Sequence, residues 1–215
     1  PIGILSSIIL PPETEEQDLR RIMSELEQAC DELQIEILGG HTEVSDAVNR
    51  PVITVTGVGK VARSDLLSTG GMRPGDELVM TKWAGLEGSA IIAAEKRDVL
   101  EQTLPAHLID TAESFLKHIS VVPEAKIAMQ HGVHAMHDVT EGGIFGALWE
   151  MGAASGVGIV ADLDKIPIRQ ETIELCEVFD INPYLLISSG CMLIGCENGN
   201  LLVERLQEAG IPAAV

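Results

Sequence analysis

Two glycine-containing segments of the chain combine residue types that could bind a phosphate group. The first, Gly39-Gly-His-Thr-Glu43, directly follows an apolar run over residues 35–38 that predicts a strand. Paired glycines permit tight backbone geometry in which main-chain amides face an anion, and Thr42 and Glu43 could contact a phosphate or its metal ion. A simple turn at the end of a strand would use the same residues, so the spacing leaves both interpretations open.

The second segment, His137-Asp-Val-Thr-Glu-Gly-Gly143, stands between a predicted strand and a predicted helix. Ligands collect at the carboxyl ends of strands in α/β sheets, and a helix N-terminus attracts phosphate through its free amides and its dipole. The alternative is that Asp138 only caps the helix, with Glu141 completing a capping box. Because the paired glycines exceed what a cap requires, the segment is also a candidate phosphate-binding loop.

Two further turns match catalytic or phosphate-binding elements only in part. Gly85-Leu-Glu-Gly88, with Lys82 just before it, lacks the spacing of a P-loop and is better explained as a connector. Ser188-Ser-Gly-Cys191 places a serine and a cysteine at the start of a late strand, but no base that would activate either side chain can be named. We therefore expect a turn that leads into a buried strand.

The histidines and cysteines form no recognisable metal-binding or disulfide pattern. His131, His134 and His137 are spaced by three, so a strand would send neighbours in this series to opposite faces, and no cysteine or carboxylate set completes a tetrahedral zinc site. We predict no metal site from this series. Nor do the cysteines suggest a disulfide framework, and we expect reduced, buried thiols in a cytoplasmic protein. The cysteines are Cys30, Cys176, Cys191 and Cys196.

The candidate segments above lie between predicted strands and helices. The alternation of strands and helices along the chain predicts an α/β or α+β fold with helices packed on mixed sheets. The turn cluster Gly70-Gly-Met-Arg-Pro-Gly-Asp76 marks a boundary between a domain over residues 1–70 and a second over residues 71–215. We expect strands over 4–10, 35–38, 51–61, 77–81, 133–136, 158–163 and 191–196. We expect helices over 14–33, 89–96, 105–118, 123–130, 138–154, 170–179 and 200–209.

The composition excludes several classes of partner. The chain has 215 residues, of which 33 are acidic and 14 basic, and its formal net charge is −19. Such a chain repels a phosphate backbone and an anionic membrane surface. No apolar run approaches the roughly 20 residues of a transmembrane helix. We therefore expect a cytoplasmic protein with neither a nucleic-acid nor a membrane partner.

Four segments, in this order, resemble the AIR synthase (PurM-like) superfamily of ATP-binding proteins. The similarity runs from about Pro1 to Gly210 and is greatest to the HypE-like and AIR synthase-related members. It implies a PurM-like two-domain architecture, with the C-terminal part of an ATP-binding, dimerising domain over residues 1–70 and a C-terminal α/β domain over residues 71–215. The segments are Gly40-His-Thr-Glu43, Arg73-Pro-Gly-Asp76, Asp138-Val-Thr-Glu-Gly-Gly143, and Pro183-Tyr184 followed by Ser189-Gly190.

The resemblance also implies a function. Members of the superfamily use ATP with Mg²⁺ to activate an oxygen atom by phosphorylation, and HypE-like members act on a carbamoyl group in the maturation of nickel–iron hydrogenase. The implied partners are a nucleotide, a small amide or carbamoyl-type substrate, a second copy of the chain in a homodimer, and another maturation protein. The resemblance assigns Gly39, Gly40, His41 and Thr42 to the nucleotide–metal site, and Asp138, Thr140, Gly142 and Gly143 to a facing loop of the C-terminal domain.

Three residues depart from the pattern of the HypE-like group. His41 stands where a magnesium-binding carboxylate is common, Glu141 replaces a frequent arginine, and Ser189 replaces a glutamate assigned to dehydration. These departures leave two other interpretations open. One is a non-catalytic PurM-fold binding or assembly module that has lost ATP chemistry, and the other is a kinase-like enzyme that acts on a small metabolite.

In the family, a segment with a glycine-rich stretch and acidic magnesium ligands precedes the region that matches Pro1. We therefore expect the N-terminal domain of this chain to be incomplete and the C-terminal domain to be truncated at its end. We also expect the chain alone to be inactive.

Overall fold

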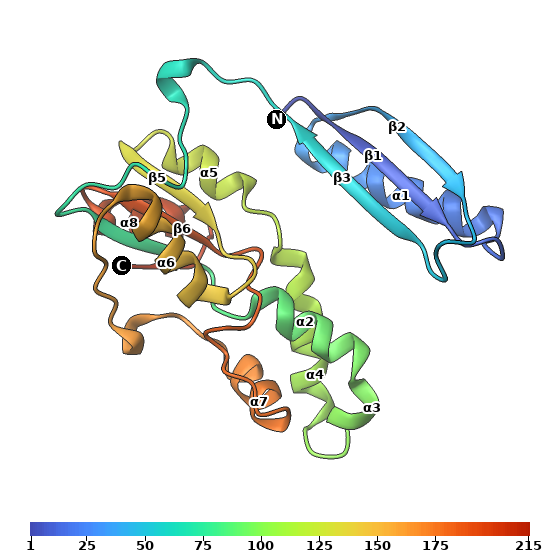
Figure 1. Ribbon diagram of the computed structural model, residues 1–215. Coiled ribbons are helices and arrows are strands. Elements are labelled where there is room, and N and C mark those ends of the chain that lie inside the picture. The colour runs from blue at the N-terminus through green and yellow to red at the C-terminus, as the bar shows by residue number, and fades with distance from the viewer. The chain divides into compact units, whose positions relative to one another are not determined.

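The computed structural model describes all 215 residues, which form two compact units, Pro1–Leu66 and Leu67–Val215 (Figure 1). Both units combine helices with a sheet, which confirms the predicted α/β class with mixed sheets. The strands are β1 (Gly3–Leu10), β2 (Glu36–Val44), β3 (Val52–Val58), β4 (Glu77–Thr81), β5 (Val133–Asp138), β6 (Met192–Cys196) and β7 (Ala213–Ala214). The α-helices are α1 (Glu16–Leu33), α2 (Leu86–Glu95), α3 (Arg97–Leu100), α4 (Ala106–Glu113), α5 (Val122–Ala128), α6 (Gly143–Ser155), α7 (Gln170–Val178) and α8 (Gly199–Glu208).

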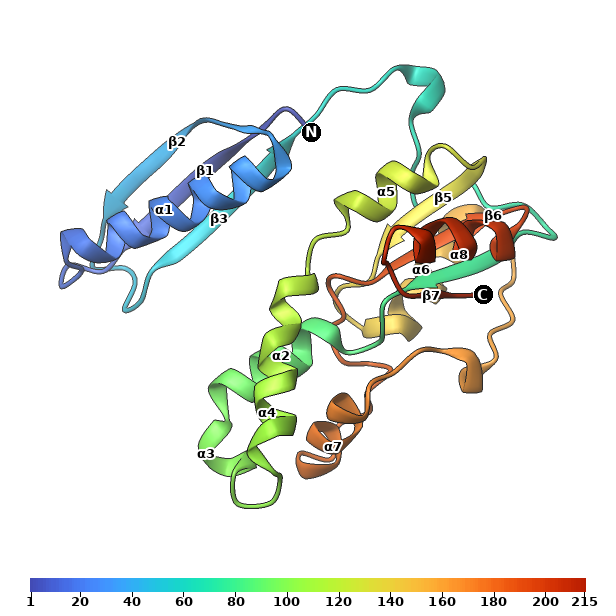
Figure 2. The same cartoon turned by 180° about the vertical axis from the view of Figure 1, so that it is seen from behind.

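The first unit is a three-stranded sheet with one helix along it. β1 lies in the middle, parallel to β2 and antiparallel to β3, and α1 follows one face of the sheet (Figures 1 and 2). Alternate side chains of β1 are buried at Ile4, Ile8 and Leu10, whereas Leu5 is 44% exposed. This alternation is typical of a strand with one covered face. The capping box of α1 uses Glu15 and Asp18.

The second strand differs from the prediction. β2 continues to Val44, so the turn predicted at Gly39–Thr42 is wrong. Gly40 pairs with Ser6 of β1 so closely that an added Cβ would overlap the carbonyl oxygen of Ser6. Gly40 therefore allows close pairing of the two strands, and the local sequence alone does not distinguish this tertiary requirement from a turn.

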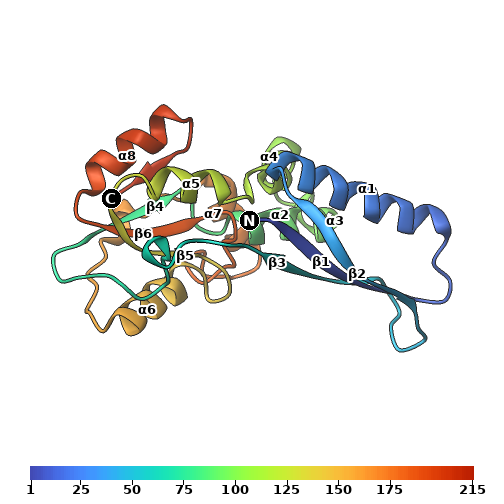
Figure 3. The same cartoon turned by 90° about the horizontal axis from the view of Figure 1, so that it is seen from above.

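The second unit is built on an antiparallel four-stranded sheet in the order β5-β6-β4-β7. α6 lies on one face, and α5 and α8 lie on the other (Figure 3). Met80 and Leu193 belong to the core on the α6 side, whereas their neighbours Val79 and Ile194 belong to the core on the α5 and α8 side. The strands are therefore buried on both faces, as their continuous apolar runs predict.

A separate apolar core joins the helices α2, α4 and α7 (Figure 2). Trp83 packs edge-on against Phe115 at 5.0 Å between ring centroids. The single helix predicted over residues 105–118 is divided, because α4 ends at Glu113 and a 3₁₀ helix continues to His118. None of the helices in the structure is both long and apolar enough to cross a bilayer.

One predicted strand is absent. Residues 158–163 do not join the sheet, although their apolar and β-branched composition favours a strand. Neither the backbone N–H groups nor the carbonyl groups of residues 158–161 have a backbone hydrogen-bond partner. A strand requires a neighbouring strand to pair with, and composition alone does not supply one.

Candidate functional site

Three segments of the second unit converge near the carboxyl ends of β4 and β5. They are the Gly85–Gly88 turn, residues 138–143, which we call the candidate loop, and residues 183–191, which we call the supporting segment. The backbone N–H groups of Gly85 and Gly88 donate to Ser188 Oγ at 2.6 Å and to Ile187 O at 2.9 Å. The supporting segment therefore lies between the other two and bonds to both, because the N–H of Val139 in the candidate loop donates to Cys191 O at 3.0 Å.

Asp138 does not cap the helix that follows it. It is the last residue of β5, pairs with Met192 of β6, and its side chain is 61% exposed. The N-cap of α6 is Gly142, which has no side chain to cap the helix, so the capping-box interpretation with Glu141 is wrong. The thirteen-residue helix α6 thus begins without a side-chain acceptor at its N-terminus.

The paired glycines of the candidate loop have a backbone explanation. Gly142 and Gly143 have φ values of +78° and +58°, a region that favours glycine. At Gly143 an added Cβ would lie 2.5 Å from Tyr184 O and 2.7 Å from Leu186 O. Glycine is therefore needed at Gly143 both for its conformation and for contact with the supporting segment.

The charge of the candidate loop limits how it could hold a nucleotide. Asp138 and Glu141 are exposed acids, and the loop contains no basic residue. A phosphate here would depend on main-chain amides and the dipole of α6, with a cation between it and the carboxylates. Asp138 suits one position around Mg²⁺, which is commonly held by one or two carboxylates with phosphate oxygens and water. No cluster of three metal-binding side chains exists in the chain, so other ligands would have to complete such a site.

The other predicted segment, Gly39–Thr42, belongs to β2 of the first unit. Its side chains alternate between the two faces of the sheet, so His41 and Thr42 point in opposite directions. His41 is 70% exposed, and its Nε2 lies 3.5 Å from Glu43 Oε2. The assignment of Gly39, Gly40, His41 and Thr42 to a nucleotide–metal site stays a prediction.

Ser188 and Cys191 serve the fold, as the turn interpretation expects. The buried Ser188 hydroxyl accepts from Gly85 N–H and donates to Leu186 O at 2.8 Å. Burial raises the pKa of the Cys191 thiol far above its ordinary value, and burial raises the pKa of Cys176 to about 11. Both thiols are therefore protonated at neutral pH and are poor nucleophiles. All cysteines of the chain are free and buried, as predicted.

Two of the spaced histidines have carboxylate partners. His134 Nδ1 lies 2.9 Å from Asp76 Oδ2, and His137 Nε2 lies 2.6 Å from Glu150 Oε2. These contacts join β5 to the turn before β4 and to α6. The histidines therefore stabilise the packing of β5 in this structure.

Sequence reasoning missed the role of Lys82. Its side chain is 8% exposed, and its Nζ donates to the carbonyl oxygens of His118, Ser120 and Gly190. It also pairs with the buried carboxylate of Glu124. A lysine inside an apolar run was the available signal, because lysine is buried almost only when it is paired.

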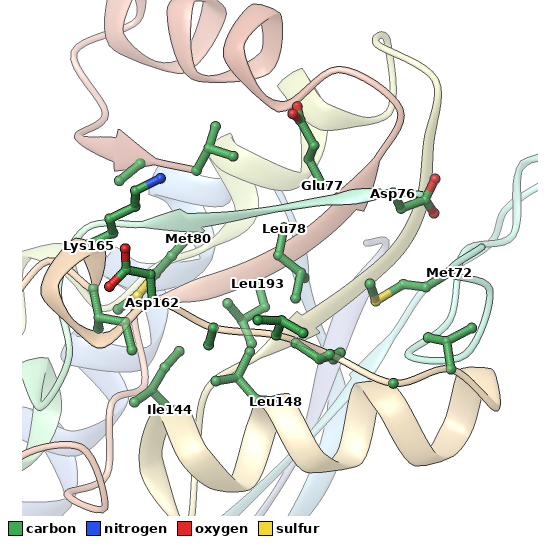
Figure 4. Close-up of a pocket in the computed structure, with 18 of the residues that line it drawn as sticks. Met72, Asp76, Glu77, Leu78, Met80, Ile144, Leu148, Asp162, Lys165 and Leu193 are labelled. Atoms are coloured by element: carbon green, nitrogen blue, oxygen red, sulfur yellow. The ribbon is translucent and has the colours of Figure 1, made fainter. Parts of the chain in front are cut away.

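Sequence reasoning also missed a cleft of about 320 Å³ between the sheet and α6 (Figure 4). Leu78, Leu148 and Leu193 line its apolar part, and Asp162 and Lys165 lie at one end. No residue of the candidate loop lines the cleft, although the next residue, Ile144, does. The cleft and the candidate loop are therefore separate features.

Comparison with known proteins places these features in a family. The family models for the N-terminal and C-terminal domains of AIR synthase related proteins match residues 1–61 and 73–215. A hydrogenase expression/formation protein of Methanocaldococcus jannaschii is 27% identical over 97% of this chain and 60% of its own length. The carbamoyl dehydratase HypE of Cupriavidus necator is 31% identical over 91% of this chain and 54% of its own length. The chain thus spans about half to three fifths of these curated relatives.

Solved structures share the fold. A structure of the hydrogenase maturation protein HypE in complex with ATP has a TM-score of 0.78 at 20% identity, over all of this chain and 63% of that one. A HypE–HypF complex gives a TM-score of 0.82 at 20% identity, over all of this chain and 70% of that one. At this identity the likeness establishes the fold alone. Together with the two matched domains, it confirms the resemblance found in the sequence: the chain belongs to the AIR synthase related protein family.

Proposed function

We propose that this chain is part of a HypE-like protein that uses ATP with Mg²⁺ to activate an amide or carbamoyl-type oxygen by phosphorylation. One observation carries the proposal: α6 has Gly142 as its N-cap and therefore no side-chain cap, and the exposed carboxylate of Asp138 at the end of β5 precedes that cap by four residues in the chain. The names of the curated relatives support the carbamoyl substrate and the role in hydrogenase maturation.

The candidate loop would hold the phosphates through its backbone. At the start of α6 the N–H groups of Gly143 and Phe145 already donate to backbone carbonyls, so the donors left for a phosphate would be the N–H groups of Gly142 and Ile144. The helix dipole and the Thr140 hydroxyl in the same loop would add to them. Asp138 would bind Mg²⁺, which neutralises its repulsion of the phosphate oxygens. ATP supplies the phosphoryl group that converts the amide oxygen into a leaving group. The family resemblance also assigns Gly39, Gly40, His41 and Thr42 to nucleotide binding, and this assignment is part of the proposal.

The partners follow from the same proposal. A maturation protein is one partner, supported by the solved HypE–HypF complex. A second copy of the chain is the other, supported by apolar side chains on strands of the first unit that are only partly covered: Leu5 is 44% and Val52 42% exposed. Leu5 and Val52 share a face of the sheet. Val52 of β3 pairs directly with Ile9 of β1, and Ile9 points to the same face as Leu5 because the two are four residues apart in one strand.

Calorimetric titration of Mg-ATP into the full-length protein tests the nucleotide site. We expect saturable heat that disappears when Mg²⁺ is chelated, and we expect Asp138→Asn to weaken binding without lowering the melting temperature. Glu204→Gln is a matched control, because it removes an exposed carboxylate charge from α8, outside the candidate loop. A folded protein that binds no Mg-ATP would refute the proposal, and an unchanged affinity in Asp138→Asn would exclude Asp138 from the site.

A non-catalytic assembly module is the second candidate, and two observations favour it. Glu141 is exposed in the candidate loop, where it adds negative charge near any phosphate. Ser189 lies in the supporting segment, and a serine hydroxyl cannot act as a general base as a glutamate does. Under this function the protein would bind its maturation partner with equal affinity in the presence and absence of Mg-ATP.

A further inference from the structure

The buried pair Lys82–Glu124 contacts the supporting segment but not the candidate loop. Lys82 directly follows β4 and is 8% exposed, and Glu124 on α5 is 1% exposed. Three backbone carbonyl groups accept from the ammonium at 2.7–2.9 Å, those of His118, Ser120 and Gly190. Glu124 supplies the opposite charge, while its Oε2 has no hydrogen-bond partner.

The backbone at Lys82 shows that its side chain has a specific use. Its φ is +56°, in the left-handed region that favours glycine. A lysine persists in such a conformation only where its surroundings hold it there. The hydrogen bonds of the ammonium hold Lys82 in this conformation. They join three segments that are distant in sequence: the end of β4, the 118–120 connection and the supporting segment.

The contacts run from Lys82 to the candidate loop in two steps. Lys82 Nζ holds the carbonyl of Gly190, and the carbonyl of the next residue, Cys191, accepts from the N–H of Val139. Val139 stands between Asp138 and Thr140 in the candidate loop. Gly190 also lies close to the 118–120 connection, because a Cβ added there would lie 2.8 Å from His118 O.

We propose that Lys82, neutralised by Glu124, is a positioning residue of the candidate site: it fixes Gly190 and Cys191 and thereby the position of Asp138 and Thr140. This inference rests on the proposed function for its link to nucleotide binding, but its structural part does not. Lys82 itself does not contact the nucleotide, because its three N–H donors are directed to backbone carbonyls.

The test compares three variants. Lys82→Met with Glu124→Gln removes both charges together, and replacing a buried ion pair by neutral groups of similar size is commonly tolerated. Lys126→Met is the matched control, since Lys126 is an exposed lysine on the same helix α5. Lys82→Gly with Glu124→Gln is the third variant: it relieves the backbone conformation at position 82 and removes the ammonium, while the glutamine avoids an unpaired buried carboxylate.

Hydrogen exchange of the complete chain is the first measurement. We expect faster exchange in residues 138–143 and 183–191 of both the double variant and its glycine counterpart, Lys82→Gly with Glu124→Gln. We expect α7 to be unchanged and Lys126→Met to equal wild type. If exchange in these two segments is unchanged in the folded double variant, Lys82 does not position the loop and the proposal is overturned.

Calorimetric titration of Mg-ATP is the second measurement. We expect the double variant to bind at least roughly tenfold more weakly than wild type, as is common when a group that orients a binding residue is lost. Faster exchange with unchanged affinity would overturn the functional part. If the wild-type protein binds no Mg-ATP, the proposed function fails, while the exchange measurement still decides whether Lys82 positions the loop.

Discussion

Alanine substitution of one glycine at each end of α6 separates the cost of a steric clash from the cost of a left-handed backbone conformation. Gly143 begins the helix with a φ of +58°, and Gly156 ends it with a φ of +67°. A Cβ added at Gly143 would lie 2.5 Å from Tyr184 O, whereas one added at Gly156 would meet nothing within 4 Å. The two variants therefore share the cost of placing alanine in the left-handed region, and only Gly143→Ala adds the clash.

The expected magnitudes follow from these two contributions. The conformational cost is about 1–2 kcal/mol for each variant. Forcing a methyl group against a packed backbone carbonyl adds about 1–3 kcal/mol. We therefore expect Gly156→Ala to lower the unfolding free energy by about 1 kcal/mol, and Gly143→Ala by about 3 kcal/mol.

Urea unfolding followed by circular dichroism measures the difference, since a change of midpoint at constant slope reports stability. For a unit of this size, 1 kcal/mol corresponds to about 2–4 °C in melting temperature, so the two variants should be about 4–8 °C apart. Equal losses in the two variants would show that Gly143 does not contact the supporting segment as described, and would remove the packing argument for the paired glycines.

Two further predictions concern buried groups near the candidate site. Ser188→Ala leaves the buried N–H of Gly85 without its acceptor and should cost about 1–3 kcal/mol in urea unfolding, whereas Ser189→Ala, which removes a hydroxyl with no hydrogen bond in the structure, should change stability little. A cost at Ser189 equal to that at Ser188 would contradict this assignment. Burial raises the pKa of Cys176 from 9.0 to about 11, so the unfolded chain loses its thiol proton first, and stability should fall as pH rises from 9 to 11. Cys176→Ala should make that part of the stability profile less steep, with Cys191 still contributing, and an unchanged slope would show that the Cys176 thiol does not contribute.

The sequence predicts the structure best where a local pattern is sufficient. The apolar spacing of Leu19, Ile22 and Leu26 predicts α1, because residues three and four apart lie on one face of a helix and that face can pack on the sheet. The continuous apolar run at the start of β6 likewise predicts a strand buried on both faces. In both cases the period of the side chains and the final packing agree.

Prediction fails where a distant segment decides the outcome. Gly39 and Gly40 are typical of a turn, but the close approach of β1 keeps them in a strand. Residues 158–163 have the composition of a strand but no neighbour to pair with. The role of Lys82 depends on carbonyl groups that lie 36 to 108 residues away in the sequence. None of these neighbours can be identified from the residues on either side of the position.

The net charge of −19 determines what kind of nucleotide site this chain could contain. Lys82 is the basic residue that precedes the Gly85–Gly88 turn, but its ammonium is buried and bonded to carbonyl groups and Glu124, so it is not free to bind a phosphate. The candidate loop itself adds two acids. Phosphate binding would therefore depend on backbone amides, whose orientation is set by Gly142 and Gly143, and on a cation at Asp138. Because amides bind only when they point correctly, such a site depends on the packing of the supporting segment more than a lysine-rich site would.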